Sequence, residues 1–149
     1  MNASISILLV DDNEDDIFFA KHALREAQIT NPYKAATDGQ EAIDYLSGVG
    51  KFTDRAQFPL PGVMLLDLKM PRKTGFEVLQ WVRGEAHLRT LPIIILTTSC
   101  ETSDIRRAYE LGANSYLQKP SNTKVLAEMM NSLKSYWLHY NQFLPLVAV

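Results

Sequence analysis

Residues 5–12 read ISILLVDD, an apolar run that ends abruptly in two acidic side chains. Apart from Ser6 this run is apolar, which is typical of a β-strand that is buried on both faces. Two later runs have the same form, since residues 63–67 read VMLLD and residues 93–98 read IIILTT. Each run therefore predicts a strand inside a parallel sheet, followed directly by polar side chains.

Helical patterns alternate with these strands along the chain. The predicted strands are 5–10, 33–36, 63–66, 93–96 and 115–117. The predicted helices are 15–27, 38–48, a segment after Gly75, a segment capped by Thr102 or Ser103 and ended by Gly112, and 123–140. Because right-handed crossovers place helices on both faces of a parallel sheet, we predict an α/β, doubly wound, flavodoxin-like fold with strand order 2-1-3-4-5.

Composition narrows the possible classes of protein. The 149 residues, 46% of them hydrophobic, fit one domain, which we place at 1–141, with an apolar tail at 142–149. A net charge of −2 offers no basic face for nucleic acid. The first residues lack the pattern of a signal peptide, and their apolar run is too short to span a membrane. With Cys100 as the only cysteine, we predict the cytoplasm.

Polar side chains follow the predicted strands where each one ends. Asp11 and Asp12 follow the first strand, Asp67 the third, Thr97 the fourth and Lys119 the fifth. In the order 2-1-3-4-5, strand order reverses between the first and third strands, and ligands bind at that point, outside the carboxyl ends of the strands. The topology thus predicts that three carboxylates lie together there.

Three neighbouring carboxylates need compensation. Two of them about 4 Å apart repel by about 4 kcal/mol at an effective dielectric constant near 20. A cation, the Lys119 ammonium or protonation of one carboxyl can remove this cost, and an open, oxygen-only site suits Mg²⁺. One carboxylate could then attack phosphorus, with Thr97 and Lys119 stabilising the phosphoryl oxygens. The residues therefore supply the parts of an aspartyl-phosphate site.

Four motifs together resemble a known family. They are LLVDDNEDD at 8–16, LLDLKMP at 65–71 followed by TG, ILTTS at 95–99 and GANSYLQKP at 112–120. The chain from Ile5 to about Tyr140 resembles the receiver domain of bacterial two-component response regulators, of the stand-alone CheY-like type. The resemblance implies a phosphoprotein switch in a phosphorelay, and not an enzyme.

The resemblance also implies roles for the acidic residues. Asp67 would accept the phosphoryl group from a histidine kinase. The cofactor Mg²⁺ would be held by Asp12, Asp67 and the Lys69 carbonyl, with Asp11 acting through water.

The remaining site residues would contact the phosphoryl group or respond to it. Thr97 and Tyr116 would form the switch pair, with Thr98 beside them. Lys119 would contact the phosphoryl group and precede a cis Pro120.

Two features narrow the resemblance to response regulators of cyanobacterial phytochromes. The connection at 48–62, GVGKFTDRAQFPLPG, is long, and the last helix carries the aromatic run YWLHY at 136–140. The implied upstream partner is therefore a phytochrome-type histidine kinase. With no output domain expected after the last helix, the signal would leave through contacts with a downstream protein.

The last helix has a wider apolar arc than one core-facing stripe requires. Surplus apolar surface often marks a partner site. We predict a homodimer through the face formed by the helix before Gly112, strand 115–117 and the last helix, helped by the tail FLPLVAV. The alternative is that the tail folds back over its own domain.

Three other functions are alternatives to a phosphorylation switch. A haloacid dehalogenase-type phosphatase needs an Asp two positions after its nucleophile, where this chain has Lys69. A flavodoxin-type flavin binder needs neutral donors where DDNEDD would repel a phosphate. A receiver that is never phosphorylated and acts only as an interaction module stays open. Glu14, Asp15 and Asp16 are interpreted as acidic residues that stabilise a helix N-terminus.

Overall fold

A computed structural model describes residues 5–147. Residues 1–4 of the predicted domain and 148–149 of the predicted tail lie outside the described residues. The strands are β1 (Ile7–Val10), β2 (Tyr33–Ala36), β3 (Val63–Leu66), β4 (Ile93–Thr97) and β5 (Ser115–Gln118). The α-helices are α1 (Glu14–Glu26), α2 (Gly39–Ser47), α3 (Gly75–Gly84), α4 (Thr102–Glu110) and α5 (Thr123–Leu133).

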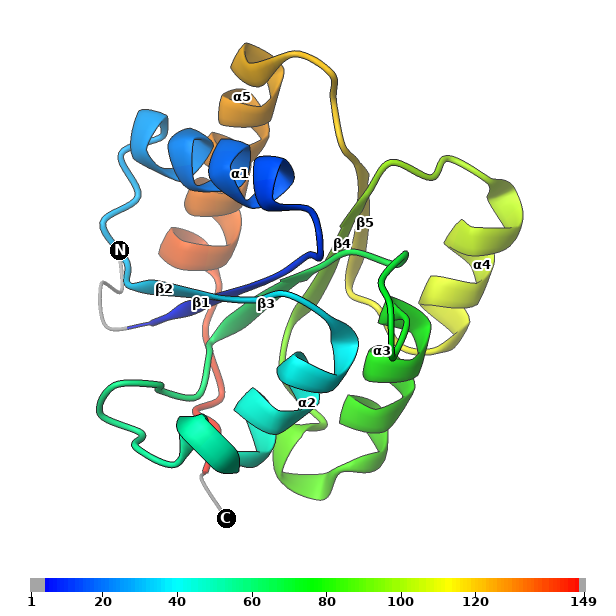
Figure 1. Cartoon of the computed structure of the whole chain (residues 1–149). Helices are drawn as coiled ribbons and strands as arrows, with labels where there is room; N and C mark the ends of the chain where they lie inside the picture. The colour runs from blue at the N-terminus through cyan, green and yellow to red at the C-terminus, as the bar shows by residue number, and fades with distance from the viewer. Residues whose placement is uncertain (1–4, 148–149) are drawn as a thin grey trace.

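The five strands form one parallel sheet in the order β2-β1-β3-β4-β5, which confirms the predicted topology. Helices α1 and α5 cover one face, and α2, α3 and α4 cover the other (Figure 1). The three central strands are buried throughout, while β2 and β5 at the edges are partly exposed. The unbroken apolar runs of the sequence are therefore the strands with helices on both sides.

Side chains alternate along each central strand between two hydrophobic cores. In β1, for example, Leu8 and Val10 join the core beneath α2, α3 and α4, whereas Ile7 and Leu9 join the core beneath α1 and α5. This alternation is the normal consequence of the period of two in a strand. It explains why no polar position occurs within the central strands before their carboxyl ends.

The start of α4 differs from the prediction. The hydroxyls of Thr102 and Ser103 do not cap α4, because its N-cap is Glu101, which makes no side-chain capping bond. The hydroxyl that organises this loop is Ser99, which accepts from the Glu101 amide at 3.3 Å. Gly112 does follow the end of α4, with a φ of 104° that favours glycine.

The last predicted helix, 123–140, is two kinds of helix. The α-helical part ends at Leu133, and Lys134–Tyr140 is a π-helix. A π-helix is rare and uses hydrogen bonds between residues five apart, as from the Asn141 amide to the Tyr136 carbonyl. Within it Leu138 is buried, and Trp137 packs against the same core. The sequence could not show this change, because the wide apolar arc of the last helix does not distinguish an α-helix from a π-helix.

The tail crosses beneath the amino ends of the strands, as its red trace shows in Figure 1. Phe143 packs against the core under α1 and α5, and Leu146 packs against the core on the opposite face. Leu144 and Val147 are 70% and 74% exposed. At least part of the tail thus folds back over its own domain, as in the alternative reading. No helix within residues 5–147 is long and apolar enough to cross a membrane.

Candidate functional site

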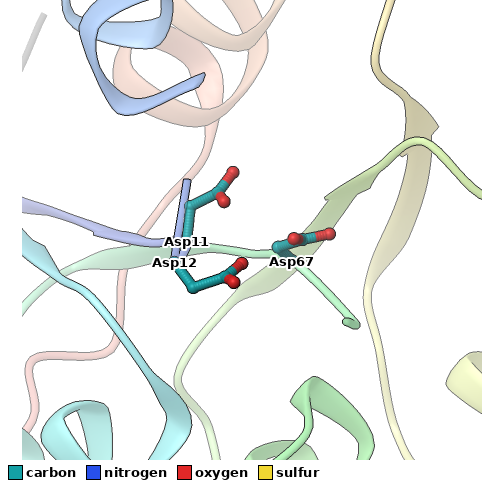
Figure 2. Close-up of side chains that lie close together, drawn as sticks. All are labelled: Asp11, Asp12 and Asp67. Atoms are coloured by element: carbon teal, nitrogen blue, oxygen red, sulfur yellow. The ribbon is translucent and has the colours of Figure 1, made fainter. Parts of the chain in front are cut away.

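Three carboxylates meet where β1 and β3 end. One oxygen from each of Asp11, Asp12 and Asp67 lies within 4.8 Å of the others, and Figure 2 shows the pair from β1 beside Asp67 from β3. The sheet sets this arrangement, since the Asp67 amide donates to the Val10 carbonyl at 2.9 Å. Asp11 and Asp67 are buried, whereas Asp12 is exposed. The predicted carboxylate cluster is therefore present.

Lys119 reaches this cluster from the end of β5. Its Nζ donates to Asp11 Oδ2 at 2.5 Å and lies 3.7 Å from Asp67 Oδ2. The Lys119 amide donates to the Thr97 carbonyl at 2.7 Å, which fixes the backbone next to β4. Only 12% of the side chain is exposed. The long side chain thus brings one positive charge across the strand end from the edge of the sheet.

Burial and pairing change the titration of two of these groups. Burial raises the pKa of the Asp11 carboxyl, and hydrogen bonds from Lys119 and the Asn13 amide offset only part of this effect. Burial alone would lower the pKa of the Lys119 ammonium, but hydrogen bonds to Asp11 and Asp16 outweigh it and raise the pKa. The Lys119 ammonium therefore stays positively charged. The hydrogen bonds to Asp11 do not fully compensate for the cost of burying its negative charge.

The donor set fits a hard divalent cation. Asp11, Asp12 and Asp67 supply only oxygen ligands, and Lys119 neutralises one of their three charges. The exposure of Asp12 leaves room for the waters that Mg²⁺ usually keeps. Lys69 follows two residues after Asp67, and its ammonium points elsewhere, to Asp104 at 3.9 Å.

Thr97 is fully buried at the end of β4, and no described residue offers its hydroxyl a hydrogen-bond partner. An unpartnered buried hydroxyl costs about 1–3 kcal/mol, so such groups are uncommon and often mark functional positions. Tyr116 lies on the neighbouring strand, and its hydroxyl donates to the Ser99 carbonyl at 2.9 Å. Thr98 is exposed. Thr97 thus ends β4, and the Tyr116 side chain reaches from β5 to the loop that follows Thr97.

The loop after Asp67 folds tightly back on it. The Gly75 amide donates to the Leu68 carbonyl at 2.9 Å, and a Cβ at Gly75 would lie 2.2 Å from the Asp67 carbonyl oxygen. A glycine is therefore required for α3 to begin against the backbone of Asp67. Thr74 begins that helix with a capping box that includes Glu77.

The peptide bond before Pro120 is trans, so the prediction of a cis bond was wrong. That prediction depended on the family resemblance, not on any local residue. Trans is the default because cis costs about 0.5–1 kcal/mol even before proline. Here the Lys119 side chain reaches the carboxylates with the trans bond.

Two residues of the site were missed in the sequence. Asp16, interpreted only as a helix-stabilising acid, is an ion-pair partner of Lys119 at 2.9 Å. Its place in the acidic first turn of α1 already had a local explanation, so nothing in the sequence pointed to this contact. Asp104 accepts the Ser99 hydroxyl at 2.6 Å and so ties α4 to the loop after β4. No sequence pattern indicated this contact.

Comparisons with known proteins agree with this geometry. The family model of the response regulator receiver domain matches residues 7–131. The chain is 36% identical to the probable methanogenesis regulatory protein FilR2 of Methanothrix harundinacea, over 91% of the chain and 85% of the relative. It is 35% identical to response regulator Rcp1 of Synechocystis, over 89% and 88%.

Solved structures give the same result. The phosphorylated cyanobacterial phytochrome response regulator RcpA superposes with a TM-score of 0.88 at 31% identity, covering 96% of this chain and all of RcpA. The Mn²⁺-bound form of Rcp1 superposes with a TM-score of 0.84 at 33% identity, covering 95% and 99%. The chain belongs to the response regulator receiver domain family.

Proposed function

We propose that Asp67 is the phosphoryl acceptor of this response regulator. One observation carries the proposal: the Asp67 carboxylate lies in a three-carboxylate cluster, 3.7 Å from the charged ammonium of the partly buried Lys119. In the proposed step, an Asp67 oxygen attacks the phosphorus of a phosphohistidine. The new P–O bond forms as the P–N bond breaks, and the histidine nitrogen keeps the electron pair and takes a proton from solvent.

Each neighbouring residue has a part in this step. Asp12, Asp67 and the Lys69 carbonyl would hold Mg²⁺, with Asp11 acting through water. When bound, this ion would neutralise charge on the phosphoryl oxygens. Lys119 would donate to a phosphoryl oxygen from the other side. The proposed cation is supported by the oxygen-only ligand set and by the Mn²⁺-bound form of the similar Rcp1.

We propose that the signal leaves through Thr97 and the loop that follows it. A phosphoryl oxygen on Asp67 would give the unpartnered Thr97 hydroxyl an acceptor. Movement of Thr97 would carry the Ser99 carbonyl, which holds the Tyr116 hydroxyl. Because Ser99 also donates to Asp104 in α4, the surface of α4 and β5 would change with it. A few charge-assisted hydrogen bonds of about 1.5–3 kcal/mol each suffice for such a switch.

The test is incubation of the wild type and Asp67→Asn with acetyl phosphate, each with Mg²⁺ and with EDTA. Intact-mass spectrometry should show one added phosphoryl group on the wild type with Mg²⁺ only, and none on the variant. An unmodified wild type would leave the phosphorylation-independent interaction module as the better reading.

For the upstream partner, receiver domains interact with histidine kinases. We propose a phytochrome-type kinase, because Rcp1 and the phytochrome response regulator RcpA resemble this chain over nearly its whole length. Phosphotransfer from a phosphorylated cyanobacterial phytochrome kinase should be at least about tenfold faster than from an unrelated histidine kinase. Equal rates would contradict this partner.

For assembly, we propose a homodimer through α4, β5 and α5. Large apolar side chains are exposed on α4, on α5 and on the π-helix that follows α5, namely Tyr109, Val125 and Tyr136. Tyr136, 59% exposed, borders an open groove between β5 and the end of α5 that Leu117 and Met129 also line. Sedimentation should give a dimer for the full chain and a smaller mass for Tyr136→Ser. An unchanged mass after truncation beyond Asn141 would remove the tail from the interface.

A further inference from the structure

The Lys119 ammonium has more carboxylate partners than the proposed phosphoryl chemistry requires. Its Nζ lies 2.5 Å from Asp11, 2.9 Å from Asp16 and 3.7 Å from Asp67. The two shorter contacts are hydrogen bonds, whereas the contact to Asp67 is an ion pair without one. Lys119 is therefore held by Asp11 and Asp16 and not by the proposed acceptor.

Asp16 differs from the other two partners. Asp11 and Asp67 belong to the carboxylate cluster that could hold a cation, and Asp16 does not. Asp16 lies in the first turn of α1, and its amide donates to the Asn13 side chain at 3.0 Å. The helix cap thus fixes the backbone from which the Asp16 side chain reaches Lys119. A divalent cation in the cluster would attract the charge of Asp11 and Asp67 but leave the Asp16 contact in place.

We propose that Asp16 is a positioning residue that competes with the phosphoryl group on Asp67 for the Lys119 ammonium, and so weakens the binding of that group. One positive charge shared with an extra carboxylate attracts a phosphoryl oxygen less strongly. The Asp16 carboxylate also repels the phosphoryl anion directly. The inference rests on the proposed function of Asp67.

The chain offers a matched control for this idea. Asp15 precedes Asp16 in the same acidic first turn, is exposed, and makes no ion pair within the described residues. Asp15→Asn and Asp16→Asn therefore remove the same charge from the same helix end. Only Asp16→Asn changes a carboxylate that contacts Lys119.

The experiment is a titration with beryllofluoride, a phosphoryl mimic that binds carboxylates, at saturating Mg²⁺ and with ¹⁹F NMR as the readout. Asp16→Asn should bind beryllofluoride about fivefold more tightly than Asp15→Asn. A change in affinity of about fivefold corresponds to the contribution of one partly exposed ion pair. Mg²⁺ affinity without beryllofluoride should agree within about twofold between the two variants, because neither residue belongs to the cluster. A purely structural or general charge effect would not separate these two measurements.

Two results would overturn the proposal while leaving the function of Asp67 intact. The first is equal beryllofluoride affinity of the two variants, which would mean that contact with Lys119 has no effect. The second is weaker binding by Asp16→Asn, which would make Asp16 an anchor of Lys119 and not a competitor. Failure of the wild type to bind beryllofluoride with Mg²⁺ would instead overturn the proposed function together with this inference.

Discussion

The polar groups at the two ends of the sheet differ in how they are satisfied by partners within the protein. At the amino ends of the strands, the loop after α2 satisfies its own polar groups: Arg55 donates to the carbonyls of Tyr45, Leu46 and Phe58 at 2.7–3.2 Å. At the carboxyl ends, the buried Thr97 hydroxyl lacks a partner among the described residues, and the Lys119 ammonium forms ion pairs with three different carboxylates. We call the first the scaffold end, because its polar groups are satisfied within the protein, and the second the ligand end, because a ligand is proposed to bind there.

The largest effect should follow from breaking the scaffold end. Arg55→Met removes hydrogen bonds from three carbonyls, and the free energy of unfolding should fall by about 3 kcal/mol. Urea denaturation measures this change. Lys51→Met in the same loop is the control, because Lys51 is exposed and makes only weak contacts, an ion pair with Glu41 at 3.9 Å and a cation–π contact with the Phe52 ring. It should alter stability by less than about 0.5 kcal/mol.

Phosphorylation should be insensitive to the same change. The folded fraction of Arg55→Met should accept the phosphoryl group from acetyl phosphate at close to the wild-type rate. A much slower phosphorylation of fully folded Arg55→Met would show that the two ends of the sheet are coupled. It would contradict the distinction between the scaffold end and the ligand end.

A smaller effect of opposite sign should follow at the ligand end. Thr97→Val removes the unpartnered hydroxyl at nearly constant volume, so the unphosphorylated protein should become more stable by about 1 kcal/mol. The same variant should bind beryllofluoride more weakly, since the hydroxyl no longer meets the new acceptor. Destabilisation by Thr97→Val would mean that the hydroxyl is satisfied within the unphosphorylated protein and would contradict this account.

The smallest effect concerns the rim of the ligand end, where Asp38 caps α2 and pairs with Arg72 at 3.0 Å. Although burial opposes it, hydrogen bonds from the Glu41 amide and Arg72 lower the pKa of Asp38 below 3.8. A carboxyl whose pKa is lower in the folded than in the unfolded protein stabilises the fold at pH values above its unfolded-state pKa. This stabilisation is lost as the pH falls through the folded-state pKa.

The stability difference between the wild type and Asp38→Asn should therefore be constant near pH 6 and shrink below about pH 4, by about 1 kcal/mol in total. Thermal unfolding between pH 6 and pH 2.5 measures it. Arg72→Met should remove part of the pH dependence, because the Glu41 amide still donates to Asp38. A difference that grows as pH falls would contradict the assigned direction.

Some features of the fold and of the site were predictable from the sequence. The central strands were predictable because burial on both faces leaves an apolar run. Their order was predictable from the flavodoxin-like fold class, and this topology brings Asp11 and Asp67 together. The Asp38 and Gly48 helix boundaries were predictable because capping is local chemistry.

Contacts between distant side chains were not predictable in this way. The partnership of Asp16 with Lys119 joins residues 103 positions apart, and its acidic helix turn already had a sufficient local explanation. The π-helix after Leu133 depends on how Trp137 and Leu138 pack against the core, which no periodicity shows. The isomer before Pro120 was inferred from the family and had no local signal.

The most direct test of the central claim locates the phosphoryl group itself. The protein is phosphorylated by a phosphorylated histidine kinase with Mg²⁺, reduced with borohydride, which converts an aspartyl phosphate to homoserine, and mapped by peptide mass spectrometry. We predict homoserine at position 67 and at no other aspartate. No homoserine should form when EDTA replaces Mg²⁺ in the phosphorylation reaction. Homoserine at Asp11 or Asp12, or at no position in a protein that has taken up phosphate, would contradict the assignment of Asp67.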